Sequence, residues 1–246
     1  MYKLTIILVG IICILVLLIN YKKTNIKILV SWLCICCPLS WIEFSSMNYA
    51  DIIPAWEFNI EHISGYYFLG MTIEDFFFAP ICGILFFYIY KIIDRGINYT
   101  SSEFCKISVF SFHLMILIFF FCWGGYFGKY QALRMAIGLM CIAICWNSFD
   151  VRQFLSVMLG VFLIAGLWDI WANSFSTPQQ WFYRNINTLE YSCVYANWKF
   201  WWFKIGKGWF PLSILPYYYI SGGVFTYGVI SLLLNRFNKE KKNEFQ

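Results

Sequence analysis

Four carboxylic acids stand in or beside apolar stretches of this chain, where an ionised side chain is costly: Glu43, Glu74, Asp75 and Asp169. A carboxylate near the middle of a membrane costs roughly 2.5 to 3.5 kcal/mol on insertion scales, so an acid placed there usually has a functional reason. Glu74 and Asp75 directly precede the apolar segment 76–80, so they either cap the first turn of a helix or project into a pocket. Buried carboxyl groups of this kind can donate or accept protons, which makes them the first candidates for catalysis.

Other catalytic chemistries have less support in the residues. Glu57 and Glu61 are four residues apart, which on a helix would place both beside His62 as an acid–base cluster or as a solvated loop face. His62 and His113 are the only histidines, so a histidine-rich di-iron centre cannot form, and no HExxH, GxGxxG or P-loop motif is present. The cysteines of Cys34-Ile-Cys-Cys37 lie inside an apolar run, where they are typical of small hydrophobic residues. The last apolar run carries no lysine for a retinal Schiff base. We therefore expect no metal site and no cofactor.

The composition indicates a membrane protein. The 246 residues are 61% hydrophobic and 22% aromatic but only 13% charged, whereas a soluble domain carries about 25% charged residues. The net charge of +5 does not require a nucleic-acid partner, because Lys and Arg of membrane proteins gather in cytoplasmic loops. Apolar runs predict an all-α fold of about seven transmembrane helices in one integral membrane domain, residues 1–246, with spans at 4–19, 28–44, 76–93, 107–127, 135–146, 154–170 and 212–234.

The distribution of basic residues predicts the orientation. When Lys and Arg are assigned to alternate sides of these spans, eleven fall on the side of the carboxyl terminus and seven on the other. The positive-inside rule then places the amino terminus and two long loops, 45–70 and 171–210, outside the cell membrane and the tail after residue 235 in the cytoplasm. Most of the ten cysteines lie inside apolar runs, so no disulfide framework is indicated.

A weak internal repeat relates two parts of the chain. One span ends in Ser40-Trp-Ile-Glu43 and is followed by Trp56-Glu-Phe-Asn59, while another ends in Leu167-Trp-Asp169 and is followed by Trp181-Phe-Tyr-Arg-Asn185. We interpret this as two three-helix repeats, about 1–93 and 135–235, with a linking helix between them. Because repeat-built membrane proteins place their sites at the repeat interface, Glu43 and Asp169 are expected to lie close to each other.

One stretch resembles the signature of the small membrane-integral lycopene cyclases. It comprises Trp56-Glu-Phe-Asn59, Ile63-Ser-Gly65 and the segment from Gly70 to Phe78, which contains Glu74 and Asp75. That family has a Trp-rich loop followed by a Pro-x-Glu-Glu/Asp motif that opens a helix, in each of two homologous halves. This chain has Thr72 in place of the motif proline, and its second half has Leu215-Pro216-Tyr217 without an acid pair.

The resemblance implies an enzyme that cyclises carotenoid end groups without net redox change and without a cofactor. Glu74 would be the proton donor, and Asp75, Glu43 or Asp169 the base or cation stabiliser. Aromatic side chains would form the substrate-binding walls: Trp56, Phe76, Phe77, Trp168, Trp181 and Tyr217. The expected partners are membrane lipid, an apolar isoprenoid or carotenoid substrate and a homo- or hetero-oligomer partner, with no nucleic acid. The alternative is a non-catalytic lipid- or pigment-binding membrane protein or a small transporter.

Overall fold

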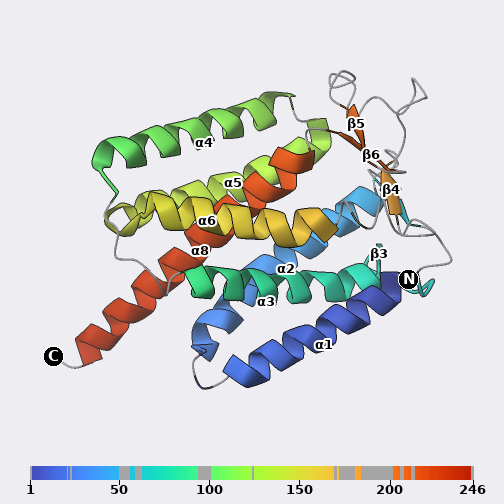
Figure 1. Cartoon of the computed structure of the whole chain (residues 1–246), viewed down its shortest axis with the longest axis horizontal. Coiled ribbons are helices and arrows are strands. Elements are labelled where there is room, and N and C mark those ends of the chain that lie inside the picture. Colours follow the sequence, from blue (N-terminus) through green and yellow to red (C-terminus); the bar gives the residue numbers. More distant parts are fainter. Residues whose placement is uncertain are drawn as a thin grey trace. The chain divides into compact units, whose positions relative to one another are not determined.

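The computed structural model describes a predominantly helical chain (Figure 1). The described residues are 2–20, 22, 24–49, 56–58, 63–93, 101–123, 125–168, 171, 181–183, 202–205, 208–211 and 214–244. They contain seven α-helices: α1 (Tyr2–Asn20), α2 (Ile26–Tyr49), α3 (Ile73–Ile93), α4 (Glu103–Trp123), α5 (Gly125–Ile144), α6 (Val151–Val161) and α8 (Ile214–Glu244). A π-helical turn, η4 (Phe162–Gly166), extends α6, and a 3₁₀ turn, η3 (Trp146–Ser148), precedes it.

Four of the described helices are long and apolar enough to cross a membrane, over Ile26–Ser45, Ile73–Ile93, Glu103–Cys122 and Ile220–Lys239. Three shorter apolar helices accompany them, over Leu4–Asn20, Tyr130–Ile144 and Val151–Gly166. Each of the seven predicted spans overlaps one of these helices. The prediction of a multi-pass, all-α membrane protein is thus confirmed in its coarse form, while the count of seven membrane crossings stays a prediction.

Two helix boundaries differ from the apolar runs. The predicted span 107–127 is divided, because α4 ends at Trp123 and α5 begins at Gly125. The sequence places two successive glycines at 124 and 125, and glycine is about 1 kcal/mol less favourable than alanine in a helix. In contrast, α8 continues to Glu244, ten residues past the predicted span end at 234, because the tail is rich in Lys, Glu and Arg, which are good helix formers.

Three short two-stranded antiparallel pairings lie in the two predicted loops. Strand β1 (Trp56–Phe58) pairs with β4 (Trp181–Tyr183), β2 (Tyr67–Phe68) with β3 (Met71–Thr72), and β5 (Trp202–Ile205) with β6 (Gly208–Pro211). The first predicted loop is also shorter than expected, since α2 runs on to Tyr49. The β1–β4 pairing is the one contact among these that joins the two loops.

The chain divides into two compact units, each built from two segments. Unit 1 comprises Met1–Leu85 and Leu167–Ser213, and unit 2 comprises Phe86–Gly166 and Ile214–Gln246. The single membrane domain with two repeat halves stays a prediction.

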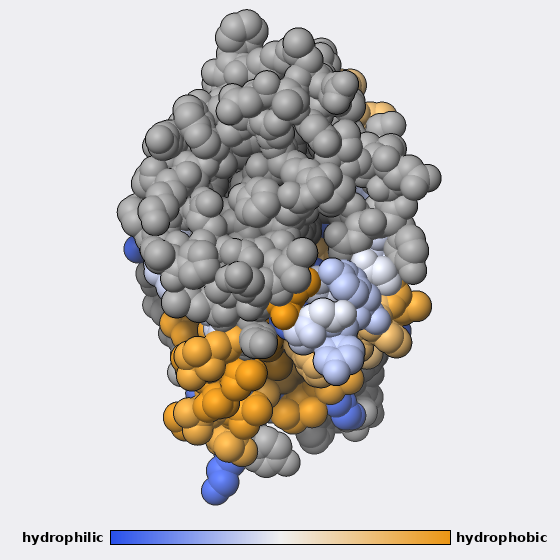
Figure 2. All heavy atoms as spheres, turned by 90° about the vertical axis from the view of Figure 1, so that its right-hand side faces the viewer, coloured by the Kyte–Doolittle hydropathy of each residue, from blue (hydrophilic) through white to orange (hydrophobic). Residues whose placement is uncertain are grey.

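Helices α1, α2 and α3 meet in the core of unit 1. The Trp32 indole N–H donates to the carbonyl oxygen of Gly83 at 2.8 Å, and the Cys13 thiol donates to that of Ile81 at 3.7 Å. An apolar cluster around Cys13 and Ile81 also includes Trp168. Large aliphatic side chains are exposed along α1, and Figure 2 shows hydrophobic residues over much of the lower surface in that view. A membrane protein presents such a surface to lipid.

Unit 2 packs α8 along α5 and against α6 (Figure 1). Glycines let the backbones approach closely: a Cβ on Gly138 would lie 2.5 Å from the Val224 carbonyl oxygen, and one on Gly223 would lie 2.7 Å from the Met158 Cα. Membrane helices often pack through small residues at their crossings. Lipid is as apolar as the helix surface, so close van der Waals contact and not the hydrophobic effect holds the helices together.

The adjacent glycines 222 and 223 provide a test of this close packing. Gly223→Ala should destabilise unit 2 by about 1 to 3 kcal/mol, because the new methyl group would overlap Met158 of α6 at its backbone Cα and at its side chain. Gly222→Ala should be neutral or slightly stabilising, since its Cβ would meet Val161 Cγ1 at an ordinary 3.5 Å and alanine favours helix. Thermal unfolding midpoints of both variants in the same detergent would measure the difference, and equal midpoints would contradict the packing described here.

Candidate functional site

The acids Glu74 and Asp75 stand in the first turn of α3, which Thr72 caps. The Thr72 side-chain oxygen Oγ1 accepts a hydrogen bond from the Asp75 backbone N–H at 3.2 Å, as an N-cap residue does. Thr72 and Asp75 have the spacing of a capping box, Thr-x-x-Asp, which is a sequence pattern that predicts a helix start at Ile73. The residue in place of the motif proline therefore serves to begin the helix.

Glu74 is 4% exposed and is held by one of its two carboxyl oxygens. Its Oε1 accepts a hydrogen bond from the Ser64 backbone N–H at 2.6 Å. The other oxygen, Oε2, is buried and has no hydrogen-bond partner among the described residues. Buried polar atoms are nearly always bonded, so an unbonded oxygen at this place is an exception that a ligand or a proton transfer would explain.

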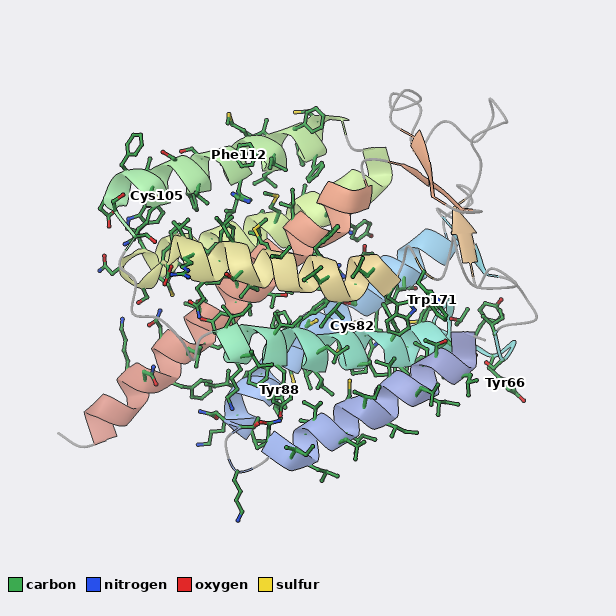
Figure 3. All side chains as sticks on the ribbon, viewed as in Figure 1. Tyr66, Cys82, Tyr88, Cys105, Phe112 and Trp171 are labelled. Atoms are coloured by element: carbon green, nitrogen blue, oxygen red, sulfur yellow. The ribbon has the colours of Figure 1, made fainter. Side chains whose placement is uncertain are left out.

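A tight hairpin places Ser64 opposite Glu74. Strands β2 and β3 are joined by Leu69 and Gly70, whose φ angles are 47° and 77°, so both have the left-handed backbone of a primed hairpin turn. The carbonyl oxygen of Leu69 accepts a hydrogen bond from the Ser45 hydroxyl at 2.6 Å, which fastens the turn to α2. The Tyr66 carbonyl oxygen accepts from the Ile73 N–H at 3.0 Å, and Tyr66 itself is exposed beside the start of α3 (Figure 3).

A proline in α3 determines how α2 packs against it. Pro80 has no backbone N–H, so the carbonyl oxygen of Phe76, four residues earlier, loses its usual partner within the helix. The Trp41 indole N–H donates to that oxygen at 3.0 Å. The Trp41 and Phe76 rings also stack, with centroids 4.7 Å apart and planes 8° from parallel. This pair joins the carboxyl-terminal half of α2, which carries Glu43, to the first turns of α3.

Phe44, Phe78 and Trp168 form an aromatic row in unit 1. The Phe44 ring lies 6.2 Å from that of Phe78, and Phe78 meets Trp168 edge to face at 5.4 Å. The Trp168 indole nitrogen Nε1 is buried without a hydrogen-bond partner among the described residues. Glu43, next to Phe44 in the sequence, is 1% exposed.

The predicted acids are therefore buried in unit 1 wherever the structure describes them. Glu43 Oε2 and Asp75 Oδ2 are, like Glu74 Oε2, buried atoms without a hydrogen bond in the described part of the chain, although both residues have interactions elsewhere. Asp169 lies outside the described residues, so its predicted proximity to Glu43 stays a prediction.

The predicted substrate walls divide into three groups. Phe76 stacks on Trp41 and Trp168 contacts Phe78, whereas Phe77 is 51% exposed, with its ring 5.6 Å from that of Phe76. Trp56 and Trp181 are placed by their backbones in β1 and β4. Tyr217 stands in the first turn of α8, in unit 2.

The β1–β4 pairing joins the two segments of the predicted repeat. Glu57 lies opposite Phe182, with Trp56 opposite Tyr183 and Phe58 opposite Trp181. The repeat aligns Trp56-Glu-Phe58 with Trp181-Phe-Tyr183. In the pairing, the first residue of each segment lies opposite the third residue of the other, as expected for two equivalent strands related by a local two-fold axis. The strand also corrects one expectation: Glu57 is not on a helix, so the helical spacing that would group Glu57 with Glu61 does not apply.

Histidine 113, in unit 2, is a core residue. Its ring nitrogen Nδ1 is 2.7 Å from the Val109 carbonyl oxygen, one helical turn back, and its ring meets Phe154 edge to face at 4.9 Å. No group of three His, Cys, Asp or Glu side chains in the described part of the chain could hold a metal ion.

Comparisons with known proteins found no match: no protein-family model, curated protein or solved structure corresponds to this chain. The resemblance to lycopene cyclases therefore rests on the sequence motif alone.

A double-mutant cycle tests the role of the Phe76 carbonyl. Trp41→Phe keeps the ring stack but removes the N–H, and it should destabilise the protein by about 1 to 3 kcal/mol, because the Phe76 carbonyl oxygen is left unbonded. Pro80→Ala restores a backbone N–H at the right place, so Trp41→Phe should cost about 1 kcal/mol less in that background. Unfolding free energies of the four proteins give the coupling. Additive effects would show that Trp41 acts by ring packing only.

Proposed function

We propose that this protein is a membrane isomerase that cyclises an end group of a linear isoprenoid polyene, such as a carotenoid, with Glu74 as the general acid. The observation that carries the proposal is the state of the Glu74 carboxyl group. One oxygen is fixed by the Ser64 N–H, and the other is buried and unbonded among the described residues. A carboxylic acid held by one oxygen can present a proton from the other to a substrate.

The reaction needs one acid, one base and no oxidant. Transfer of the Glu74 proton to the terminal double bond forms a C–H bond and leaves a carbocation on the substrate. The electron pair of a neighbouring double bond then forms the ring C–C bond. A carboxylate removes a proton from the new ring, and its electron pair restores a double bond. The candidates for this base are Asp75, Glu43 and Asp169.

The surroundings of Glu74 suit a cationic intermediate. Phe78 lies one helical turn from Glu74 on the same face of α3 and contacts Trp168. The π-faces of such rings stabilise a carbocation without reacting with it. An apolar polyene would reach this part of unit 1 from the bilayer, in which it is already dissolved.

A non-catalytic pigment- or lipid-binding protein is the second candidate, and a specific contact favours it. The bond from the Ser64 N–H to Glu74 gives the carboxylate a structural task, since it secures the hairpin to α3. The Thr72 cap does the same for the first turn. In a binding protein, the buried acids would stabilise the helix start and the aromatic row would hold the polyene unchanged.

Substitution of Glu74 separates these candidates. In lycopene-producing cells we expect the chain to form ring-bearing pigments, and Glu74→Gln should lower their yield about 10²- to 10⁴-fold, because the amide keeps the shape and the Ser64 bond but delivers no proton. Glu240→Gln, the same change near the polar end of α8, should leave turnover intact. Pigment analysis at matched membrane levels measures both.

The outcomes are distinct. Full ring formation by Glu74→Gln would exclude Glu74 as the acid. A wild-type chain that co-purifies with unchanged polyene and forms no rings would establish the binding protein instead.

We also propose the orientation that the distribution of basic residues indicates, with the amino terminus outside and the end of α8 in the cytoplasm. A reporter that is active only in the cytoplasm should therefore be active when fused after Gln246 and inactive when fused before Met1. The reverse pattern would overturn the orientation without affecting the assignment of Glu74.

A further inference from the structure

A groove of about 540 Å³ opens on unit 2 between the start of α4 and α6. Its volume is within the roughly 300 to 1,000 Å³ typical of small-molecule sites. Cys105, labelled in Figure 3, lines it from α4. Ser101, just before α4, and Arg152, in the first turn of α6, stand at its polar end. The groove shares no residue with the acid site of unit 1.

Two stripes of side chains divide the surface of α6. The residues that α6 buries are Val151, Phe154, Val157 and Val161. The groove is lined by the buried Val151 and by a second set of α6 residues, Arg152, Leu155, Ser156 and Leu159. The second set has the spacing i, i+3, i+4 and i+7, which places its members on one face of the helix. That face borders the packed core at Val151, while the other four lining residues of α6 do not belong to its buried set.

The groove changes from polar to apolar along the helix axis. Arg152 is the second residue of α6, and Leu159 lies seven residues further, which corresponds to about 10 Å at 1.5 Å per residue. Leu155 and Ser156 lie between them on the same face, and the charged group is at the Arg152 end. A ligand that matches this order has an anionic group at one end and a hydrocarbon chain at the other.

The polar end is built around an anchored hydroxyl. Ser101 is buried, and its Oγ accepts a hydrogen bond from the Val151 N–H at 3.0 Å, which leaves its own hydroxyl hydrogen to donate. The Asp150 carboxylate accepts from the N–H groups of Arg152 and Gln153 at 2.8 and 3.2 Å, and so caps the helix. The guanidinium of Arg152 is an exposed cation at a helix amino terminus, where the helix dipole disfavours positive charge and a bound anion would be stabilised.

We infer that this groove binds an anionic phospholipid, with its phosphate against Arg152 and Ser101 and the upper part of one acyl chain along Leu155 and Leu159. Basic pockets between membrane helices are known to hold anionic headgroups, and α6 with η4 forms an apolar helix in a chain of several membrane spans. A free phosphate ion would use the same polar groups but would gain nothing from the leucines. The experiment must therefore separate lipid from free anion.

The full-length protein would be reconstituted in nanodiscs of equal phosphatidylglycerol and phosphatidylcholine, then re-extracted in mild detergent, and its bound lipid measured by mass spectrometry. We expect enrichment of phosphatidylglycerol in the wild type. Arg152→Gln should lower bound phosphatidylglycerol about fivefold or more, and Arg152→Lys should retain most of it. Lys27→Gln removes one exposed cation from α2, outside the groove, and should change nothing.

Leu159→Gln tests the apolar end and should also lower bound phosphatidylglycerol, with an unchanged elution volume on size exclusion. Two results would overturn the inference: lipids bound in the nanodisc ratio, or displacement of phosphatidylglycerol by excess inorganic phosphate, which would identify a site for a free anion. An equal loss of phosphatidylglycerol in Arg152→Gln and Lys27→Gln would also overturn the inference, because binding would then depend on the net charge of the protein and not on the groove.

Discussion

The organisation of unit 1 depends on a backbone oxygen that its own helix cannot satisfy. Pro80 removes the N–H that would bond to the Phe76 carbonyl, and in an apolar setting an unbonded carbonyl costs several kcal/mol. The Trp41 indole supplies the missing donor from α2. Because a hydrogen bond is directional and the stacked rings fix the rotation of both side chains, this contact sets the register of α2 against α3. The burial of Glu43, Glu74 and Asp75 in the same unit follows from these two helices and the hairpin between them.

The same region shows that structural and catalytic tasks can share a residue. Glu74 uses one oxygen to hold the hairpin at Ser64, and its second oxygen stays available. A carboxyl group with neither contact would rotate freely and hold a proton in no fixed direction. Fixing one oxygen is therefore a form of preorganisation, in which the protein limits the geometry of proton transfer before the substrate arrives.

Much of the helical framework could be predicted from the sequence, because membrane helices are long and uniformly apolar. The predicted helix boundaries were wrong where the apolar run and the local helix propensity disagree. Glycines lie inside an apolar run between α4 and α5, and the end of α8 is polar but consists of good helix formers. At the site, the burial of Glu74 and its place at a helix start were predictable, and the Thr72 cap could have been read from its spacing to Asp75. The roles of Trp41 and Ser64 could not, because each arises from a contact between segments distant in sequence. Strands of three residues such as β1 carry no periodicity at all, so their pairing depends entirely on the tertiary fold.

The β1–β4 pairing also has a consequence for biosynthesis. The two strands are separated by more than a hundred residues, including most of unit 2. At a translation rate of about 5 to 20 residues per second, β1 is synthesised roughly 6 to 25 seconds before its partner exists. Throughout that interval its backbone donors and acceptors are available to any other strand, which is the circumstance in which exposed edges mispair. The β1–β4 pairing can therefore form only after Trp181–Tyr183 has been synthesised, so unit 1 is completed after the first segment of unit 2 has been made.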